Sequence, residues 1–465
     1  MHAARRSSAR LGALVLVVSC GPSPSRDTTV DTPPLEAGAA LWTQQLAGAG
    51  YPSARDVAFD GGGNIVIAGS FQDELTIADS KLTGAGLDDI FAARFDGDGQ
   101  LLWAHGWGGD GIDGAHALGV GPDGTIWLAG PFERTLALGD AELTARANPD
   151  VFVARLSPAG KVELAVQLTG TGTAQVDDLA VTADGGAVLV GFFDGTLAVA
   201  GLEPLASAGM QDGYVAKLAR DGTPQWAFAI GGVTTDYAKA VAVNSRGDVI
   251  ATGQFRGEAK LGAATLRSAG AQTDIFLTTI DAETGTPIWT KSFGGGGTDG
   301  AYAVAVDDGD NVIVAGRFDK AALFGSSPLE PEGGFDVFLA KYNAAGDHIW
   351  SRRLGGPGAD NVTDVAIAGH VILVTGEFEG RARFGGDPLE SAGRHDGFFA
   401  KYSAAGAPVW ARRFGGEGQD QLDAVAMTAD GAAAAVGAFH HSAEFGDTKL
   451  TATGIYEPVL LRVTP

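Results

Sequence analysis

The chain has 465 residues and a formal charge of −24, with 56 acidic against 32 basic residues. This excess of negative charge repels phosphate backbones and argues against nucleic acid as a partner. The 71 glycines argue against a mostly helical protein, and the 45% content of hydrophobic residues is enough to build cores along the chain. A single cysteine excludes a disulfide framework.

Residues 1–19 have the pattern of an export signal. Arg5, Arg6 and Arg10 carry positive charge without any acid, and an apolar run from Leu11 to Val18 follows. A run of this length is too short to span a bilayer, which takes roughly 20 residues in a helix. We therefore expect residues 1–19 to be a signal peptide and not a membrane-spanning anchor.

The end of this segment, Val17-Val18-Ser19-Cys20, resembles the lipobox of bacterial lipoproteins. The resemblance implies that Cys20 is lipidated and becomes the new N-terminus, so that the protein reaches the membrane through its lipid. The alternative is a small cysteine that happens to follow an ordinary signal. Gly21 is not the acidic residue that retains lipoproteins in the inner membrane of enteric bacteria, which favours the outer membrane or cell surface.

Residues 20–39 hold four prolines among Ser, Thr and Asp, a composition that favours an extended tether. A seven-fold repeat begins at residue 40. Tryptophan recurs with spacings that stay close to 61 residues, and Leu164 takes its place in one copy. The marker positions are Trp42, Trp103, Leu164, Trp226, Trp289, Trp350 and Trp410. Because stacked repeats bury their faces against one another, residues 40–465 are expected to form one body.

The residue pattern of each repeat predicts four strands, here called A, B, C and D in chain order. The clearest copy has apolar runs at 302–306, 312–316, 336–342 and 348–352, separated by Gly, Asp and Asn turns. Strands A and B are apolar on both faces, so the sheet should be covered on both sides. A radial array of four-stranded antiparallel blades provides that environment.

The two ends of the repeat region predict how the array closes. The chain enters on a lone D strand, residues 40–46, and leaves on a lone C strand, residues 459–463. The last A and B strands would then take C from the C-terminus and D from the N-terminus, which leaves no open sheet edge. The predicted fold is an all-β, seven-bladed β-propeller with this 3+1 closure, and a monomer.

The combination of Asp336-x-Phe338-x-Ala340-Lys341, Trp350 and Gly355-Gly356-x-Gly358-x-Asp360 resembles the bacterial seven-bladed propeller repeats called SBBP repeats. The resemblance covers about residues 40–465 and implies an exported or surface propeller. It implies no single activity. This chain departs from a minimal repeat in its longer B–C connections, each of which predicts an added short hairpin.

One position per repeat breaks the regular pattern, two residues before the centre of strand A. Its occupants are polar and differ between repeats, and strand direction places them at the mouth of the central channel, on the face of the long B–C connections. We call them the ring residues, and they are the candidate binding site: Arg55, His116, Asp177, Lys239, Tyr302, Thr363 and Asp423. The alternative is that these positions are solvated and drift without selection.

Four loops fit the calcium-binding pattern GGxGxD of parallel β-rolls: 108–113, 294–299, 355–360 and 415–420. Because these copies lie about 61 residues apart, adjacent turns cannot stack. We expect the Asp side chains to accept amide hydrogen bonds in the D–A loops, with calcium as the alternative. His440-His441 has no His or Cys partner at ligand spacing, so no metal site is assigned.

The acid that begins each C strand recurs once per repeat, at Asp89, Asp150, Asp212, Asp274, Asp336, Asp396 and Glu457. A catalytic pair should break the repeat, so these residues are interpreted as structural. We therefore expect no catalytic residue and no cofactor. The favoured function is a lipid-anchored, non-enzymatic scaffold that binds a protein or glycan. Two alternatives remain: an exported lyase or hydrolase acting at the channel mouth, and a scaffold of the envelope without a discrete ligand.

Overall fold

The computed structural model describes residues 38, 40–147 and 149–464. The signal peptide, residues 1–19, the lipidation site Cys20 and nearly all of the expected tether, residues 20–39, lie outside the described residues. Within the described part every regular element is a β-strand, all paired strands are antiparallel, and no helix occurs. None of the described residues therefore forms a helix that could cross a membrane.

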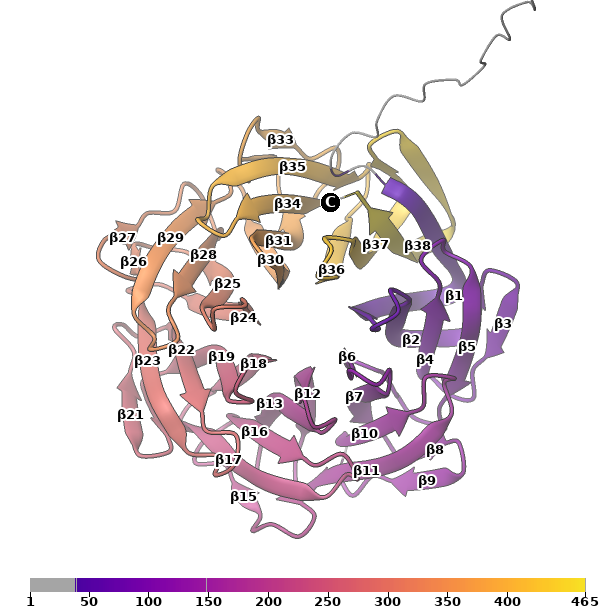
Figure 1. Cartoon of the computed structure of the whole chain (residues 1–465), viewed down its shortest axis with the longest axis horizontal. Coiled ribbons are helices and arrows are strands. Elements are labelled where there is room, and N and C mark those ends of the chain that lie inside the picture. Colours follow the sequence, from indigo (N-terminus) through magenta and orange to yellow (C-terminus); the bar gives the residue numbers. More distant parts are fainter. Residues whose placement is uncertain (1–37, 39, 148, 465) are drawn as a thin grey trace, which may run out of the picture. The chain divides into compact units, whose positions relative to one another are not determined.

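The repeats fold into four-stranded units of meander topology (Figure 1). In the best preserved copy, β24 (Asp299–Val306) pairs with β25 (Val312–Phe318), β25 with β28 (Asp336–Tyr342), and β28 with β29 (His348–Leu354). These are the predicted strands A, B, C and D. Short Gly, Asp and Asn turns join A to B and C to D: in the A–B turn, for example, Asp307 accepts the backbone N–H of Gly309 at 2.9 Å.

The other units follow the same order. Their strands in positions A to D are β6 (Ala117–Val120), β7 (Ile126–Phe132), β10 (Asp150–Leu156), β11 (Val162–Gly170); β12 (Ala174–Val181), β13 (Ala187–Phe193), β16 (Asp212–Leu218), β17 (Pro224–Gly232); β18 (Tyr237–Val243), β19 (Val249–Arg256), β22 (Thr273–Ile280), β23 (Pro287–Gly295); β30 (Asp360–Ala368), β31 (Val371–Phe378), β34 (Asp396–Ser403), β35 (Pro408–Gly415).

The long strand β1 (Ala40–Phe59) belongs to two units. Its first part pairs with β38 (Thr448–Val463), from Ala40 opposite Val463 to Gln45 opposite Val459. Its last part pairs with β2 (Ile65–Ile77). β2 then pairs with β4 (Asp89–Phe95), and β4 with β5 (Leu101–Trp107). β38 pairs in turn with β37 (Ala433–Phe445), and β37 with β36 (Gln421–Met427).

The strands in position A contact one another in a closed cycle: β1, β6, β12, β18, β24, β30, β36 and again β1. This is a β-propeller arrangement, with the A strands around the centre (Figure 1). The hydrophobic clusters lie between neighbouring units. Ile313 and Leu339 of one unit, for example, pack in the same cluster as Ile372 and Val374 of the next. Burying each such side chain contributes about 1.5–3 kcal/mol, so every unit depends on its neighbours.

The B–C connections form the predicted hairpins. In order, they pair β2 with β3 (Ser80–Thr83), β8 (Thr135–Leu138) with β9 (Ala141–Thr144), β14 (Thr196–Val199) with β15 (Leu205–Ala206), β20 (Glu258–Leu261) with β21 (Ala264–Arg267), β26 (Ala322–Leu323) with β27 (Pro328–Leu329), β32 (Arg381–Ala382) with β33 (Leu389–Glu390), and β37 with β38. Several also pair with the end of the preceding D strand, as Gly231 does with Lys260, and so join adjacent units.

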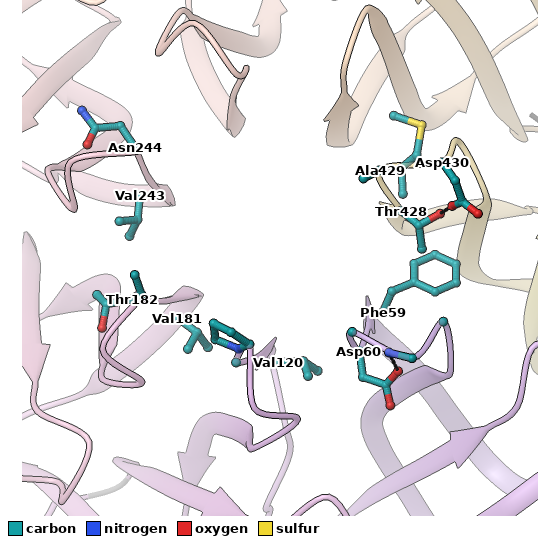
Figure 2. A pocket seen from close by; sticks show the side chains of 17 residues that line it. Phe59, Asp60, Val120, Val181, Thr182, Val243, Asn244, Thr428, Ala429 and Asp430 are labelled. Carbon is teal, nitrogen blue, oxygen red and sulfur yellow. Dashed lines mark hydrogen bonds between the residues drawn. The ribbon is translucent and has the colours of Figure 1, made fainter.

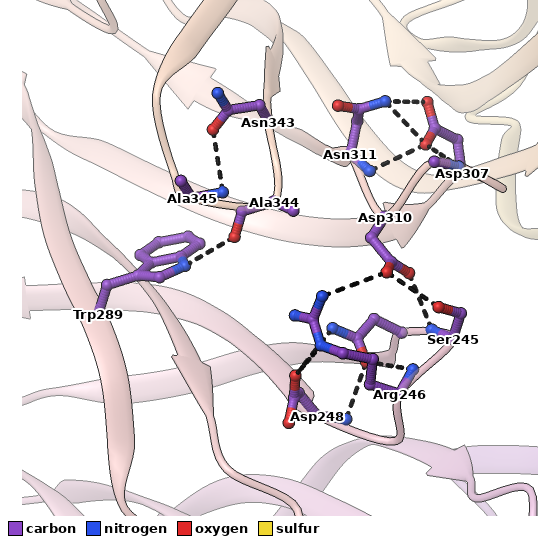
Figure 3. Close-up of polar contacts among 12 residues, drawn as sticks. Ser245, Arg246, Asp248, Trp289, Asp307, Asp310, Asn311, Asn343, Ala344 and Ala345 are labelled. Atoms are coloured by element: carbon purple, nitrogen blue, oxygen red, sulfur yellow. Dashed lines mark hydrogen bonds and ion pairs between the residues drawn. The ribbon is translucent and has the colours of Figure 1, made fainter.

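The recurring tryptophan joins neighbouring units. The indole N–H of Trp289 donates to the carbonyl of Ala344, in the C–D turn of the next unit, at 3.0 Å (Figure 3). Trp103 and Trp226 make the equivalent bonds at 3.1 and 3.0 Å. Leu164, which stands in the place of one tryptophan, lies against the next C–D turn at Gly222, where it can pack but not donate. The periodic signal in the sequence therefore marks the contact between units.

Candidate functional site

Six of the seven ring residues occupy a β-bulge in strand A. The pairing between strands A and B skips one residue in each of these units, and the skipped residues are Arg55, Asp177, Lys239, Tyr302, Thr363 and Asp423. A bulge leaves its extra residue outside the ladder and changes the direction of its side chain. His116 comes just before β6, and its backbone N–H donates to Ala129 at 2.9 Å. The bulge explains why these positions vary: strand pairing places no demand on their side chains.

All seven ring residues line a single cavity of about 250 Å³. The structure therefore brings together the complete set that the sequence singled out, although no two of its members are neighbours in the chain. The cavity lies at the end of the A strands that follows the D–A loops, the end to which strand direction assigned these residues.

Lys239 and Asp177 form an ion pair across adjacent units. The ammonium Nζ of Lys239 lies 2.9 Å from Oδ1 of Asp177. The same ammonium lies 4.8 Å from the centre of the Tyr237 ring and 5.4 Å from that of Phe192, in the range of cation–π contacts. Burial nevertheless raises the pKa of Asp177, against the lowering effect of Lys239. This side of the cavity is held in place by charge and by aromatic contacts.

Arg55 influences the groups on either side of it. Burial, together with the charge of Arg55, lowers the pKa of His116 to about 4, so the imidazole is neutral at pH 7. Burial raises the pKa of Asp423 to about 6, while Arg55 and a 2.7 Å hydrogen bond from Gln421 act in the opposite direction. Thr363 donates its hydroxyl to the carbonyl of Leu422 at 2.6 Å. The ring is thus asymmetric in charge and in hydrogen-bonding capacity.

Three further carboxylates line the cavity and were not identified from the sequence: Asp56, Asp178 and Asp364. Each follows a ring residue and accepts two backbone N–H groups, one from its own strand and one from the A strand of the next unit. Asp178 accepts from Leu179 at 2.7 Å and from Val241 at 2.8 Å. Burial raises the pKa values of Asp178 and Asp364 to about 7. The sequence does show that Asp recurs at this position in three repeats. It does not show the bulge before it, and without the bulge these side chains could not be assigned to the cavity.

The opposite ends of the A strands surround a second, wider cavity of about 820 Å³ (Figure 2). It is lined by the last residues of A strands, Phe59, Val120, Val181 and Val243, and by the A–B turns that follow them. Polar contacts hold these turns: Asp310 accepts the backbone N–H of Ser245, in the neighbouring unit, at 2.9 Å (Figure 3). No residue of this cavity was selected from the sequence, because the turns look alike and suggest only structural roles.

The Asp residues of the GGxGxD loops accept amide hydrogen bonds, as predicted. Gly295 donates to Asp299 and Gly356 to Asp360, both at 2.7 Å. Each of these Asp residues begins an A strand and also lies beside the acid that begins the C strand of the preceding unit, and this like charge adds to burial in raising its pKa. The pKa values of Asp299 and Asp360 are raised to about 7. Among the described residues, no group of three or more His, Cys, Asp or Glu side chains is placed to hold a metal ion.

The face that carries the ring cavity also exposes large apolar side chains. They occur in pairs, one from a B–C connection and one from a D–A loop, and the loops are joined by backbone hydrogen bonds such as Leu87 N–H to Gly111 O at 3.1 Å. The pairs are Leu87 with Ile112, Met210 with Val233, and Ile455 with Tyr51. Met210 and Val233 are 71% and 78% exposed. Exposed large apolar side chains are a feature of many protein-binding surfaces.

Comparison with known proteins gives limited similarities. No family model matches the chain. The regulatory protein FlaEY of Caulobacter vibrioides is 30% identical over 118 residues, which are 24% of this chain and only 12% of FlaEY. Among solved structures, the β-propeller domain of the Trilobed protease from Pyrococcus furiosus aligns over 87% of this chain and 96% of its own, with a TM-score of 0.43 and 8% identity. Sqt1 from Chaetomium thermophilum aligns over 90% and 87%, with a TM-score of 0.42 and 13% identity. None of these similarities assigns an activity to this chain.

The paired carboxyl groups predict a dependence of stability on pH. A carboxyl group whose pKa is raised on folding stabilises the fold below its unfolded pKa, near 4, and this contribution is lost as the pH rises through about 7. The free energy of unfolding should therefore fall between pH 5 and pH 8. Asp299→Asn removes one charge of a pair and should be more stable than the wild type at pH 8 by about 1–2 kcal/mol, with a smaller difference at pH 5.

Denaturant unfolding at the two pH values measures this effect. Asp308→Asn, at an exposed A–B turn, is the matched control and should keep the wild-type pH dependence. If the free energy of unfolding of Asp299→Asn changed with pH as that of the wild type does, the pair of Asp299 and Asp274 would not be a source of the pH dependence.

Proposed function

We propose that this chain is a lipid-anchored, exported propeller of seven four-stranded blades that binds a protein partner and does not catalyse a reaction. The observation that carries the proposal is the ring cavity: seven positions that differ chemically from repeat to repeat line one space of about 250 Å³. A uniform scaffold needs no such asymmetry, whereas an asymmetric ligand site does. Rigid scaffolds commonly carry their binding residues at loop ends.

The number of blades and the 3+1 closure are part of this proposal. They are supported by the sets of strands in positions A to D, and by β1 lying beside β38 in the same sheet as β36 and β37. The cycle of contacts among the A strands supports the closure as well. The resemblance to SBBP repeats belongs to the same proposal and rests on the sequence motifs.

A binding function is favoured over a lyase or hydrolase by the state of the polar groups. A general acid or base should titrate near neutrality and reach the reacting atom. The pKa of His116 is lowered to about 4, and Lys239 is engaged in its ion pair. Asp178 and Asp364 have pKa values near 7, but both carboxylate oxygens of each accept a backbone N–H. Asp178 and Asp364 are therefore arranged to hold the inner strands together.

A protein partner is favoured over a glycan by the exposed apolar pairs on the B–C connections and D–A loops, such as Met210 and Val233. Apolar side chains at the centre of a contact supply most of the affinity of protein interfaces, with polar groups fixing orientation. We infer that the partner covers the face of the D–A and B–C connections and places a polar group in the ring cavity.

Replacing His116, Lys239 and Tyr302 together with Ala tests the proposed site. The triple variant should stay folded, because the three side chains lie at bulges or a strand start and not in the core. It should bind the partner captured from detergent-solubilised envelope at least tenfold more weakly than the wild type. The matched control replaces Asn64, Asp221 and Asp308, at turns of the opposite face, and should bind normally. If the control lost binding and the ring variant kept it, the partner would bind the opposite face of the propeller, and the proposed site would be wrong.

Anchoring through Cys20 is tested by metabolic labelling with a palmitate analogue. The wild type should be labelled and found in the membrane fraction, whereas Cys20→Ala should be unlabelled, because no other thiol exists in the chain. Equal labelling of the two proteins would contradict lipidation at Cys20. Retention of unlabelled Cys20→Ala in the membrane fraction would point to a second means of attachment.

A further inference from the structure

The wider cavity of about 820 Å³, on the face opposite the ring residues, is here called the turn cavity. Five A strands from five different units end on an apolar residue that lines it: Phe59, Val120, Val181, Val243 and Met427. Figure 2 shows the first four of these side chains around one opening. The same strands therefore present polar, variable residues at one end and uniformly apolar residues at the other.

These apolar strand ends are only partly buried. Each packs with one side against a hydrophobic cluster between units, and each also lines the turn cavity. The residues two places earlier in the same strands are 4–5% exposed: Val57, Leu118, Leu179, Val241 and Val425. Apolar side chains that gather around one opening at a surface mark a place where an apolar group of another molecule can be covered.

The turns on this face are rich in acids. The A–B and C–D turns lie at the same end of the antiparallel strands, and every A–B turn except residues 369–370 contains at least one Asp. In the described A–B and C–D turns the only Lys and Arg residues are Lys161, Arg220 and Arg246. The B–C connections of the other face instead mix acids with bases such as Arg134 and Arg394. The two faces therefore differ in charge.

Part of the negative charge of the turns has no match within the described chain. Asp307 pairs with Lys341 at 2.7 Å. Asp184, Asp308 and Asp430 are exposed and form no ion pair with another described residue. Hydrogen bonds from neighbouring threonine hydroxyls lower the pKa values of Asp184 and Asp430, so both carboxylates are charged at pH 7.

One base contacts the lining of the turn cavity. The guanidinium of Arg462 lies over the Phe59 ring, 5.3 Å from its centre, and donates to the carbonyl of Ala433 at 2.9 Å. Both contacts hold it against the wall. The exposed acids of the turns therefore dominate the charge that an approaching molecule meets.

We propose that the turn cavity binds an apolar side chain of a partner protein that is flanked by basic residues. The apolar side chain enters between Phe59, Val181 and Val243, and the basic residues pair with the exposed acids of the turns. Apolar anchors supply much of the affinity of protein interfaces, and opposite charges at the rim speed association and select the partner. An anionic lipid surface, by contrast, would be repelled by the same acids. This site does not rest on the proposed function, because it lies on the opposite face from the ring residues.

Calorimetric titration of the full chain with capped peptides tests the proposal. The probes are Ac-Lys-Lys-Leu-Lys-Lys-NH₂, the same peptide with Ala in place of Leu, and Ac-Glu-Glu-Leu-Glu-Glu-NH₂. We expect saturable binding of the leucine–lysine peptide at about 0.1–5 mM. The alanine peptide should bind at least fivefold more weakly, because it lacks the apolar anchor. The glutamate peptide should bind at least tenfold more weakly, because the turns repel it.

The double variant Val181→Thr, Val243→Thr tests the apolar wall. Threonine keeps the shape of valine, and both positions are partly exposed, so the melting temperature should stay within about 3 °C of the wild type. The variant should bind the leucine–lysine peptide at least threefold more weakly. The matched control makes the same change at two exposed valines that do not line the turn cavity, Val233→Thr and Val409→Thr, and should bind within twofold of the wild type.

The triple variant Asp184→Asn, Asp308→Asn, Asp430→Asn tests the charged rim at exposed turns, where folding is not at risk. It should also bind the leucine–lysine peptide at least threefold more weakly. Its matched control removes three exposed acids of the opposite face, through Asp110→Asn, Glu379→Gln and Glu417→Gln, and should bind within twofold of the wild type.

The ring variant that replaces His116, Lys239 and Tyr302 with Ala should bind the leucine–lysine peptide as the wild type does, which separates this site from the proposed function. Equal binding of the leucine and alanine peptides would show that charge alone attracts them, and would overturn the proposal. Unchanged binding by the Val181→Thr, Val243→Thr variant, or no saturable binding to the wild type, would overturn it as well.

Discussion

The pairing of β1 with β38 is the contact on which the rest of the propeller depends. Each hydrophobic cluster draws its residues from two neighbouring units, so a missing strand would expose the apolar faces of the units on both sides. An open edge would also leave unpaired backbone groups that invite association with other chains. The pairing of β1 with β38 joins strands that are far apart in the sequence, and so avoids both costs in this sheet.

The bulges in the A strands separate the variable part of the molecule from the repeated part. Hydrogen bonding between strands A and B continues on both sides of Arg55, Lys239 or Tyr302, so these side chains can change without loss of the ladder. Asp56, Asp178 and Asp364, one residue further along, do the opposite and link adjacent units through backbone N–H groups. Neighbouring positions therefore differ in what strand pairing requires of them: the first lies outside the A–B ladder, and the second joins adjacent units.

The strands, the hairpins and the ring positions could be predicted because each repeats at a nearly constant spacing. Averaging over the repeats suppresses the ambiguity that a single short apolar run would have, and strand direction then decides at which end of the A strands residues such as His116 lie.

Other features of the site depend on contacts that the spacing of residues does not reveal. Asp56, Asp178 and Asp364 could be assigned to the cavity only once the bulges in the A strands were known. The pairing of Asp299 with Asp274 requires knowing that a loop folds back on a strand begun 25 residues earlier.

Closure of the ring is tested most directly by deleting its contribution from the N-terminus. Removing residues 40–48 takes away the strand beside β38, and removing residues 27–35 shortens the chain equally upstream of it. The first deletion should lower the melting temperature by more than about 5 °C relative to the full chain and promote association of the protein. The second should leave the melting temperature unchanged. Equal melting temperatures for the two deletions would contradict the account.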